Sequence, residues 1–231
     1  MPLAPTAVLL DLDGTLIDTE RFHRRIWQAT AADFQLDFDD AVYQQFIGLR
    51  LTDCFQLIKQ LGGNTFDLAA FRKQLAARET EGWNKGIDCK PGARALLNYL
   101  QERQIPMALV TSACQSRIDR IMAYYSWHDV FQTIVSGDTI SRPKPAPDAY
   151  QLAAQRLKTR PSACLALEDS NTGMRSALAA GCYSIMIPDL NPPDSVVRKK
   201  ANKILPDLFG VIDCLSSQGI PDEVWQDAPI T

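Results

Sequence analysis

Short runs of hydrophobic residues alternate along this chain with longer segments in which hydrophobic positions recur at helical spacing. The short runs end at polar residues or at Gly and Pro, and each has the length of a buried strand. They cover residues 7–12, 107–111, 133–136, 164–167 and 184–187. The helical patterns cover residues 93–103, 115–125, 148–157 and 172–180. Apolar strands that alternate with amphipathic helices predict a parallel sheet with helices on both faces, which is the Rossmann-like, doubly wound α/β fold.

The alternation of strands and helices stops between residues 18 and 88. Hydrophobic spacing in this block is helical, as in the stripe formed by Phe22, Ile26 and Ala29, and no run has the character of a buried strand. Glycine and proline mark the return to the regular pattern at Gly86 and Pro91. We therefore predict a helical domain of residues 18–88, inserted into a core formed by residues 1–17 and 89–231.

Composition changes this picture little. The 231 residues are 46% hydrophobic and 22% charged, which is typical of a globular protein with a sizeable core. The net charge is −3, and the longest basic run has only the three residues 198–200. Such a chain has no general attraction for nucleic acid or an anionic membrane. No apolar segment approaches the roughly twenty residues that cross a bilayer.

The cysteines and the N-terminal residues indicate the cellular compartment of the protein. The six cysteines are never closer than eighteen positions, so the local pairs typical of zinc sites are missing. Buried thiols in a reducing compartment are the expected state. The first apolar run has no basic residue before it and no cleavage site after it, unlike a signal peptide. These features favour a cytoplasmic protein.

Polar residues follow the predicted strands at the strand ends where open α/β sheets bind their ligands. Carboxylates gathered there are costly to desolvate unless a cation compensates them, and hard oxygen ligands suit Mg²⁺. A lysine adds positive charge, so that a phosphate dianion could approach. The residues at these strand ends are Asp11, Asp13, Thr111, Ser112, Lys144, Glu168 and Asp169.

Spacing suggests how some of these residues act. Asp11 and Asp13 are separated by one residue, so in an extended segment their side chains point the same way. After a turn at Gly14, one carboxylate can act on phosphorus while the other reaches the leaving or entering oxygen. Thr111 and the amide of Ser112 can bind the transferring group where a helix begins.

Four segments in this order resemble the signatures of the haloacid dehalogenase superfamily. Residues 11–16, Asp-Leu-Asp-Gly-Thr-Leu, resemble the first signature, and Thr111 is similar to the second. Lys144 in Lys-Pro-Ala-Pro-Asp resembles the third, and Glu-Asp-Ser at 168–170 with Gly173 resembles the fourth. The resemblance spans nearly the whole chain, from residue 8 to about residue 188.

The resemblance implies Mg²⁺-dependent phosphoryl transfer from a small phosphorylated metabolite. Asp11 would attack phosphorus, and Asp13 would protonate the leaving alcohol and later activate water. It implies that the phosphoryl group is bound by Thr111 and Lys144, beside the amide of Ser112 already noted. It implies that the ion is held by Asp11, the backbone carbonyl of Asp13 and Asp169, with Glu168 nearby.

The helical insertion resembles the four-helix cap of the subgroup that contains beta-phosphoglucomutase and sugar-phosphate phosphatases. His23 and Trp27 occupy positions that face the active site in the mutase, although core packing would also explain this pair. Arg50 lies near the cap loop that contacts substrate, but the mutase arginine aligns at Leu51. The third-helix lysine of the mutase has no counterpart around residues 78–80.

These differences favour a sugar-phosphate phosphatase over a hexose-phosphate mutase with the same phosphoaspartate chemistry. A non-catalytic binding module that keeps only the fold is a further alternative. The presence of Asp11, Asp13, Lys144 and Asp169 together argues against such a module. The sequence predicts neither the particular substrate nor whether the protein is a monomer or a weak dimer.

Overall fold

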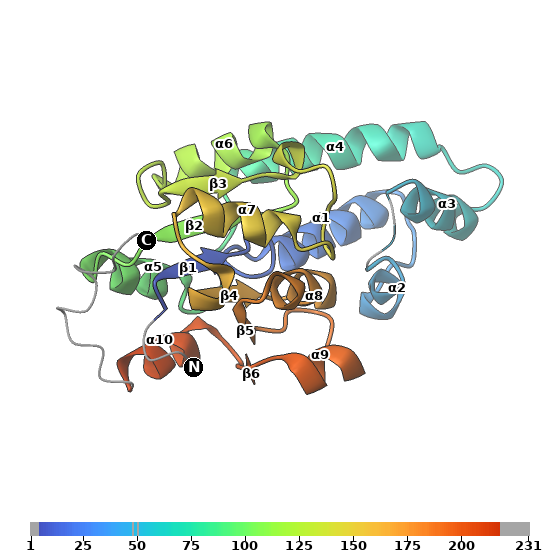
Figure 1. The fold of residues 1–231 in the computed structure, drawn as a ribbon. Helices are drawn as coiled ribbons and strands as arrows, with labels where there is room; N and C mark the ends of the chain where they lie inside the picture. Colours follow the sequence, from blue (N-terminus) through green and yellow to red (C-terminus); the bar gives the residue numbers. More distant parts are fainter. Residues whose placement is uncertain (1–4, 48, 50, 218–231) are drawn as a thin grey trace. The chain divides into compact units, whose positions relative to one another are not determined.

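The computed structural model describes residues 5–47, 49 and 51–217 (Figure 1). The chain divides into two compact units, one formed by Met1–Asp18 with Asp88–Thr231 and the other by Thr19–Ile87. Each boundary lies one residue from the boundary expected from the sequence. The roles of the two units as catalytic core and substrate cap stay predictions.

The larger unit contains a six-stranded sheet with the order β3-β2-β1-β4-β5-β6. Every pair of neighbouring strands is parallel, which confirms the predicted doubly wound fold. The strands are β1 (Ala7–Leu10), β2 (Met107–Val110), β3 (Thr133–Val135), β4 (Cys164–Glu168), β5 (Tyr183–Met186) and β6 (Lys203–Ile204). The first five match the predicted hydrophobic runs. The short edge strand β6 was missed, because neither of its residues is buried.

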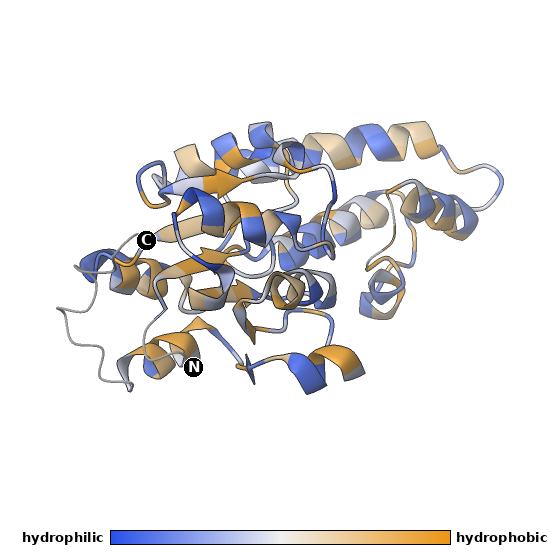
Figure 2. Ribbon diagram, in the orientation of Figure 1, coloured by the Kyte–Doolittle hydropathy of each residue, from blue (hydrophilic) through white to orange (hydrophobic). Residues whose placement is uncertain are grey.

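Helices follow the strands in the larger unit. They are α5 (Ala93–Glu102), α6 (Gln115–Tyr125), α7 (Asp148–Arg156), α8 (Asn171–Ala180), α9 (Ser195–Lys200) and α10 (Leu208–Ser216), with short 3₁₀ turns at Gly137–Thr139 and Pro161–Ala163. Helix α7 packs against β1, β2, β3 and α8, while α5 packs against α10. Figure 2 shows hydrophilic and hydrophobic residues within one helix, for example in α9.

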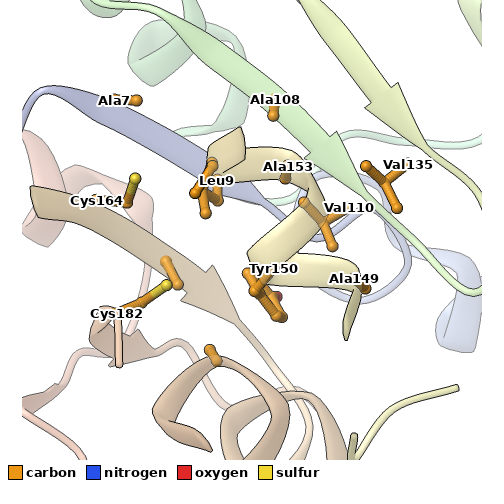
Figure 3. Packing of buried hydrophobic residues seen from close by; sticks show 13 residues of the cluster. Ala7, Leu9, Ala108, Val110, Val135, Ala149, Tyr150, Ala153, Cys164 and Cys182 are labelled. Carbon is orange, nitrogen blue, oxygen red and sulfur yellow. The ribbon is translucent and has the colours of Figure 1, made fainter. Parts of the chain in front are cut away.

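Buried hydrophobic side chains, many of them alanines, pack α7 against the sheet (Figure 3). Leu9 of β1 and Ala108 of β2 are fully buried beneath Tyr150 and Ala153 of α7. Alternate residues of a strand point to opposite faces, and Val8 is also fully buried. Both faces of β1 are therefore covered, which explains its unbroken hydrophobic sequence and fixes its carboxyl end.

The smaller unit is helical. Its described residues form α1 (Thr19–Asp33), α2 (Asp40–Gln44), α3 (Leu51–Gly62) and α4 (Leu68–Lys85). Asp39 and Asp67 cap α2 and α4 by accepting hydrogen bonds from backbone amides in the first turn. Trp27 lies at the centre of the unit, with its ring 5.4–6.3 Å from the rings of Phe38, Phe46, Phe55 and Phe71. Within the described part of the chain, no helix has both the length and the apolar character of a membrane span.

Candidate active site

Asp11 follows β1 directly and begins the loop at the carboxyl end of the central strand. Its backbone amide donates to the Leu167 carbonyl oxygen of β4, 3.1 Å away, so the strand pairing continues to this residue. The side chain is only 10% exposed. The carboxylate is therefore held in a fixed position at the edge of the sheet.

Lys144 binds three acceptors at this edge. Its Nζ donates to Asp11 Oδ1 at 2.7 Å, to Glu168 Oε1 at 2.6 Å and to the Val110 carbonyl oxygen at 3.0 Å. The ammonium group has three donors, so all of them are used. Burial lowers the pKa of Lys144, but the carboxylates of Asp11 and Glu168 outweigh burial and raise it above its usual value. The lysine is therefore a fixed positive charge beside Asp11.

Glu168 ends β4 and is fully buried. Its Oε1 also accepts a hydrogen bond from the Tyr150 hydroxyl at 2.6 Å, and its Oε2 accepts one from Ser170 Oγ at 3.2 Å. Ser170 in turn caps α8 by accepting from the Gly173 amide. A Cβ atom on residue 173 would collide with the Glu168 carboxylate, so glycine is needed where α8 begins.

Asp169 and Asp13 approach the same region from different loops. Asp169 follows β4, and Thr15 Oγ1 lies 3.4 Å from its Oδ1. Carboxylate oxygens of Asp11, Glu168 and Asp169 lie within 4.8 Å of one another. The side chain of Asp13 is outside this cluster of three and forms an ion pair with Arg117 of α6, at 2.5 Å. The backbone turns after Asp13 at Gly14, whose φ is +79°.

Thr111 and Ser112 follow β2 directly. Thr111 is almost fully buried, and its Oγ1 accepts a hydrogen bond from the Ala113 amide at 3.0 Å. Ser112 is exposed at the same strand end, before α6 begins at Gln115. The structure therefore brings both residues to the edge that carries Asp11, as the sequence predicted from strand ends.

The donor set suits a divalent cation. Burial, and the nearby carboxylates of Glu168 and Asp13, raise the pKa of Asp11 to about 8 despite the opposing effect of Lys144. Burial and the charges of Asp11 and Glu168 also raise the pKa of Asp169 well above its usual value. Lys144 alone thus compensates these carboxylates incompletely, and their oxygen atoms are ligands that hard divalent cations prefer.

The candidate substrate residues of the insertion lie in different settings. His23 on α1 is partly buried, and its Nδ1 lies 3.6 Å from Glu79 Oε1. Trp27 is 6% exposed in the aromatic core, which favours a packing role. Arg50 lies outside the described residues. Contacts of His23, Trp27 and Arg50 with a substrate stay predictions.

Sequence reasoning missed several side chains that hold the site. The Tyr150 hydroxyl bonds to Glu168, and Arg117 forms an ion pair with Asp13. Lys90 and Asp189 form an ion pair with each other. Asp189 carried a usable signal, because it follows the predicted strand 184–187 as Asp169 follows the predicted strand 164–167. The ion pairs Arg117–Asp13 and Lys90–Asp189 join residues 104 and 99 positions apart, so no local pattern indicates them.

Residues 8–187 match the family described as haloacid dehalogenase-like hydrolase, and the chain belongs to this family. It is 36% identical to hexitol phosphatase A of Escherichia coli over 201 residues, covering 82% of this chain and 89% of the relative. It is 28% identical to beta-phosphoglucomutase of Bacillus subtilis over 86% of this chain and 92% of the relative. These similarities place it in the beta-phosphoglucomutase-like subgroup.

A longer relative and a solved structure are also similar to this chain. The chain is 28% identical over 94% of its length to a bifunctional riboflavin kinase/FMN phosphatase of Arabidopsis thaliana, and spans 56% of that protein. The crystal structure of a HAD family hydrolase from Deinococcus radiodurans with bound phosphate and sodium superimposes with a TM-score of 0.81. It is 26% identical, and the match covers 94% of this chain and 97% of that one.

Proposed function

We propose that this protein is a Mg²⁺-dependent phosphatase that hydrolyses a small phosphorylated metabolite, a sugar phosphate, with Asp11 as the nucleophile. The observation that carries the proposal is the buried contact between Asp11 and Lys144 within the cluster of three carboxylates at the carboxyl edge of the sheet. The family match and the similarity to hexitol phosphatase A support the reaction and the substrate class.

In the proposed reaction, an oxygen of Asp11 bonds to phosphorus as the bond between phosphorus and the sugar oxygen breaks. Asp13 gives its proton to the departing sugar oxygen. Asp13 then takes a proton from water, whose oxygen attacks phosphorus, releases inorganic phosphate and restores Asp11. A Mg²⁺ ion held by Asp11, Asp169 and the Asp13 carbonyl, with Glu168 nearby, would supply positive charge that offsets the charge of the phosphate.

Lys144 and the end of β2 would bind the transferring group. The fixed ammonium of Lys144 neutralises negative charge on the phosphoryl oxygens. Thr111 Oγ1 and the Ser112 amide would donate hydrogen bonds to those oxygens before α6 begins. Asp13 is held by Arg117 in this structure, so its carboxyl group must leave the guanidinium to reach the sugar oxygen.

Replacement of the nucleophile tests the proposal. We expect Asp11→Asn to lower phosphate release from a panel of sugar phosphates by about 10³-fold or more, because an amide oxygen is a poor nucleophile. Asp207→Asn is the matched control, since it makes the same change at the N-cap of α10 and asparagine also caps helices. Native activity in Asp11→Asn, or activity that survives thorough chelation, would contradict the proposal.

The similarity to beta-phosphoglucomutase keeps mutase activity as a second candidate. The two reactions share attack by Asp11 and differ in whether water or a bound sugar phosphate accepts the phosphoryl group. Beta-glucose 1-phosphate with a small amount of bisphosphate primer separates them, because only a mutase forms more glucose 6-phosphate than the primer that was added. We expect release of phosphate with no glucose 6-phosphate in excess of the primer.

We also propose that the protein resides in the cytoplasm. All six cysteines are free thiols, and three of them, Cys54, Cys164 and Cys182, are buried. This state is typical of a reducing compartment. Labelling of the denatured protein directly after cell lysis should give six reactive thiols, whereas a disulfide in the isolated protein would count against this location.

A further inference from the structure

Asp189 lies near the candidate site but has no role in the reaction proposed above. It follows β5, three residues after Met186, at the same edge of the sheet as Asp169. Its side chain is 10% exposed, and its Oδ1 accepts a hydrogen bond from Lys90 Nζ at 2.6 Å. Its Oδ2 is buried and has no hydrogen-bond partner within the described part of the chain.

The Oδ2 atom of Asp189 lies on the same side of the Gly14 turn as the Asp169 carboxylate. A Cβ atom built on Gly14 would collide with the Asp169 carboxylate and would lie 3.2 Å from Asp189 Oδ2. The two carboxylates therefore approach the same point beside the turn that follows β1. Lys90 holds this turn as well, because its backbone amide donates to the Leu16 carbonyl oxygen at 2.9 Å.

A bound cation would explain why the carboxylates of Asp169 and Asp189 lie near each other. A buried carboxylate oxygen without a donor is costly, and facing carboxylates repel each other. One divalent cation would remove both costs. Asp189 lies beside the cluster of three carboxylates formed by Asp11, Glu168 and Asp169. With all groups ionised, these four carboxylates and the ammonium groups of Lys90 and Lys144 leave two negative charges, which one divalent cation would neutralise.

We propose that Asp189 is a fourth carboxylate of the cation site, with Oδ2 contributing to cation binding and Oδ1 fixed by Lys90. Lys90 is then a positioning residue, which orients Asp189 and the turn that carries Asp13. This inference rests on the proposed function, because it assigns a further ligand group to the same cation site. The site would bind a hard divalent cation that prefers oxygen ligands.

Binding of Mn²⁺ to the full-length protein, measured as free Mn²⁺ by electron paramagnetic resonance, tests this assignment without reference to activity. Asp189→Asn removes the charge but leaves Lys90 without its partner. The double variant Lys90→Met/Asp189→Asn removes the whole ion pair and avoids a lone buried ammonium. Arg175→Met/Asp194→Asn is the matched control, because it removes an ion pair elsewhere in the same unit.

We expect Mn²⁺ affinity to fall about 10- to 100-fold in Asp189→Asn and in the double variant, and to stay unchanged in the control. Native affinity in the folded double variant would overturn the inference and leave Asp189 as a partner of Lys90 only. Asp169→Asn separates this failure from a failure of the proposed function. If Asp169→Asn also binds Mn²⁺ with native affinity, the cation site itself is wrong and the inference falls with it.

Discussion

Glu168 shows how a single side chain organises the site. Its Oε1 accepts hydrogen bonds from Lys144 and Tyr150, and its Oε2 accepts one from Ser170. Tyr150 is fully buried, and its phenol ring also packs against the sheet. The tyrosine hydroxyl thus fixes the glutamate that fixes Lys144 beside Asp11.

Removal of the Tyr150 hydroxyl should weaken catalysis more than folding. We expect Tyr150→Phe to lower kcat about tenfold, because Glu168 then holds Lys144 less firmly and loss of such a supporting hydrogen bond typically costs about 10- to 100-fold in activity, while the ring still fills its place. The melting temperature should change little in comparison. Tyr43→Phe is the matched control, since it removes a buried hydroxyl 3.4 Å from Glu20 in the other unit. Equal loss of activity in both variants would argue against a positioning role for Tyr150.

The residues of the site differ in how far the sequence reveals them. Asp11, Thr111 and Asp169 lie at or just after the ends of hydrophobic runs, so the rule that ligands bind at the carboxyl ends of strands finds them. Tyr150 and Arg117 reach the site from helices, where one face of a helix supplies the contact. The helical pattern in the sequence predicts that Tyr150 and Arg117 lie on helices, but it does not identify the residues that they contact.

Among the elements, α5 depends on the glycine at its start. Gly92 has φ +83°, and a Cβ atom there would lie 2.6 Å from the Phe209 backbone nitrogen of α10. Gly181, which ends α8, has φ +89° with nothing within 4 Å of the corresponding point. The two positions share backbone conformation and differ in available space.

This difference allows conformational strain to be separated from collision. We expect Gly181→Ala to cost about 1–2 kcal/mol of unfolding free energy, since only the left-handed conformation is strained. Gly92→Ala should cost more, because α10 must also move away from α5. Urea denaturation of both variants measures the difference, and equal costs would mean that α5 and α10 can separate freely.

Elements were predicted best where hydrophobic spacing is regular. The expected helix at residues 115–125 is α6, and the expected strand at 107–111 ends one residue early as β2. Strand β6 has two residues that are not buried, and it pairs with β5 because Asn202 and Leu205 on either side bond to the β5 backbone. That pairing depends on tertiary position, which local periodicity does not contain.

At the scale of the whole molecule, the buried carboxylates link stability to pH. Burial raises the pKa of Asp11 from 3.8 to about 8 when no cation is bound. Below about pH 4 both the folded and the unfolded states hold this proton. Between the two values only the folded state holds it, so a rise in pH destabilises the folded state by up to about 1.4 kcal/mol per pH unit. Above about pH 8 neither state holds the proton, and the stability of the folded state falls no further through this group.

We therefore expect the melting temperature of the metal-free protein, relative to Asp11→Asn, to fall as pH rises from about 5 to about 8. Added Mg²⁺ should raise the melting temperature most at pH 8, because protons and the cation compete for the same carboxylates. Scanning fluorimetry in chelator and in excess Mg²⁺ measures both effects. A metal-free protein that gains stability over this window relative to Asp11→Asn would contradict the burial argument.

The central place of β1 also affects the order in which the molecule can form. This strand pairs with β2 on one side and β4 on the other, and β4 ends only at Glu168. In a chain growing on the ribosome, Asp11 therefore emerges long before β4, the strand that completes the surroundings of that residue. Until then the hydrophobic strand β1 lacks β4, one of its two neighbouring strands. A chaperone that shields residues 7–10 during synthesis should therefore improve the yield of native protein.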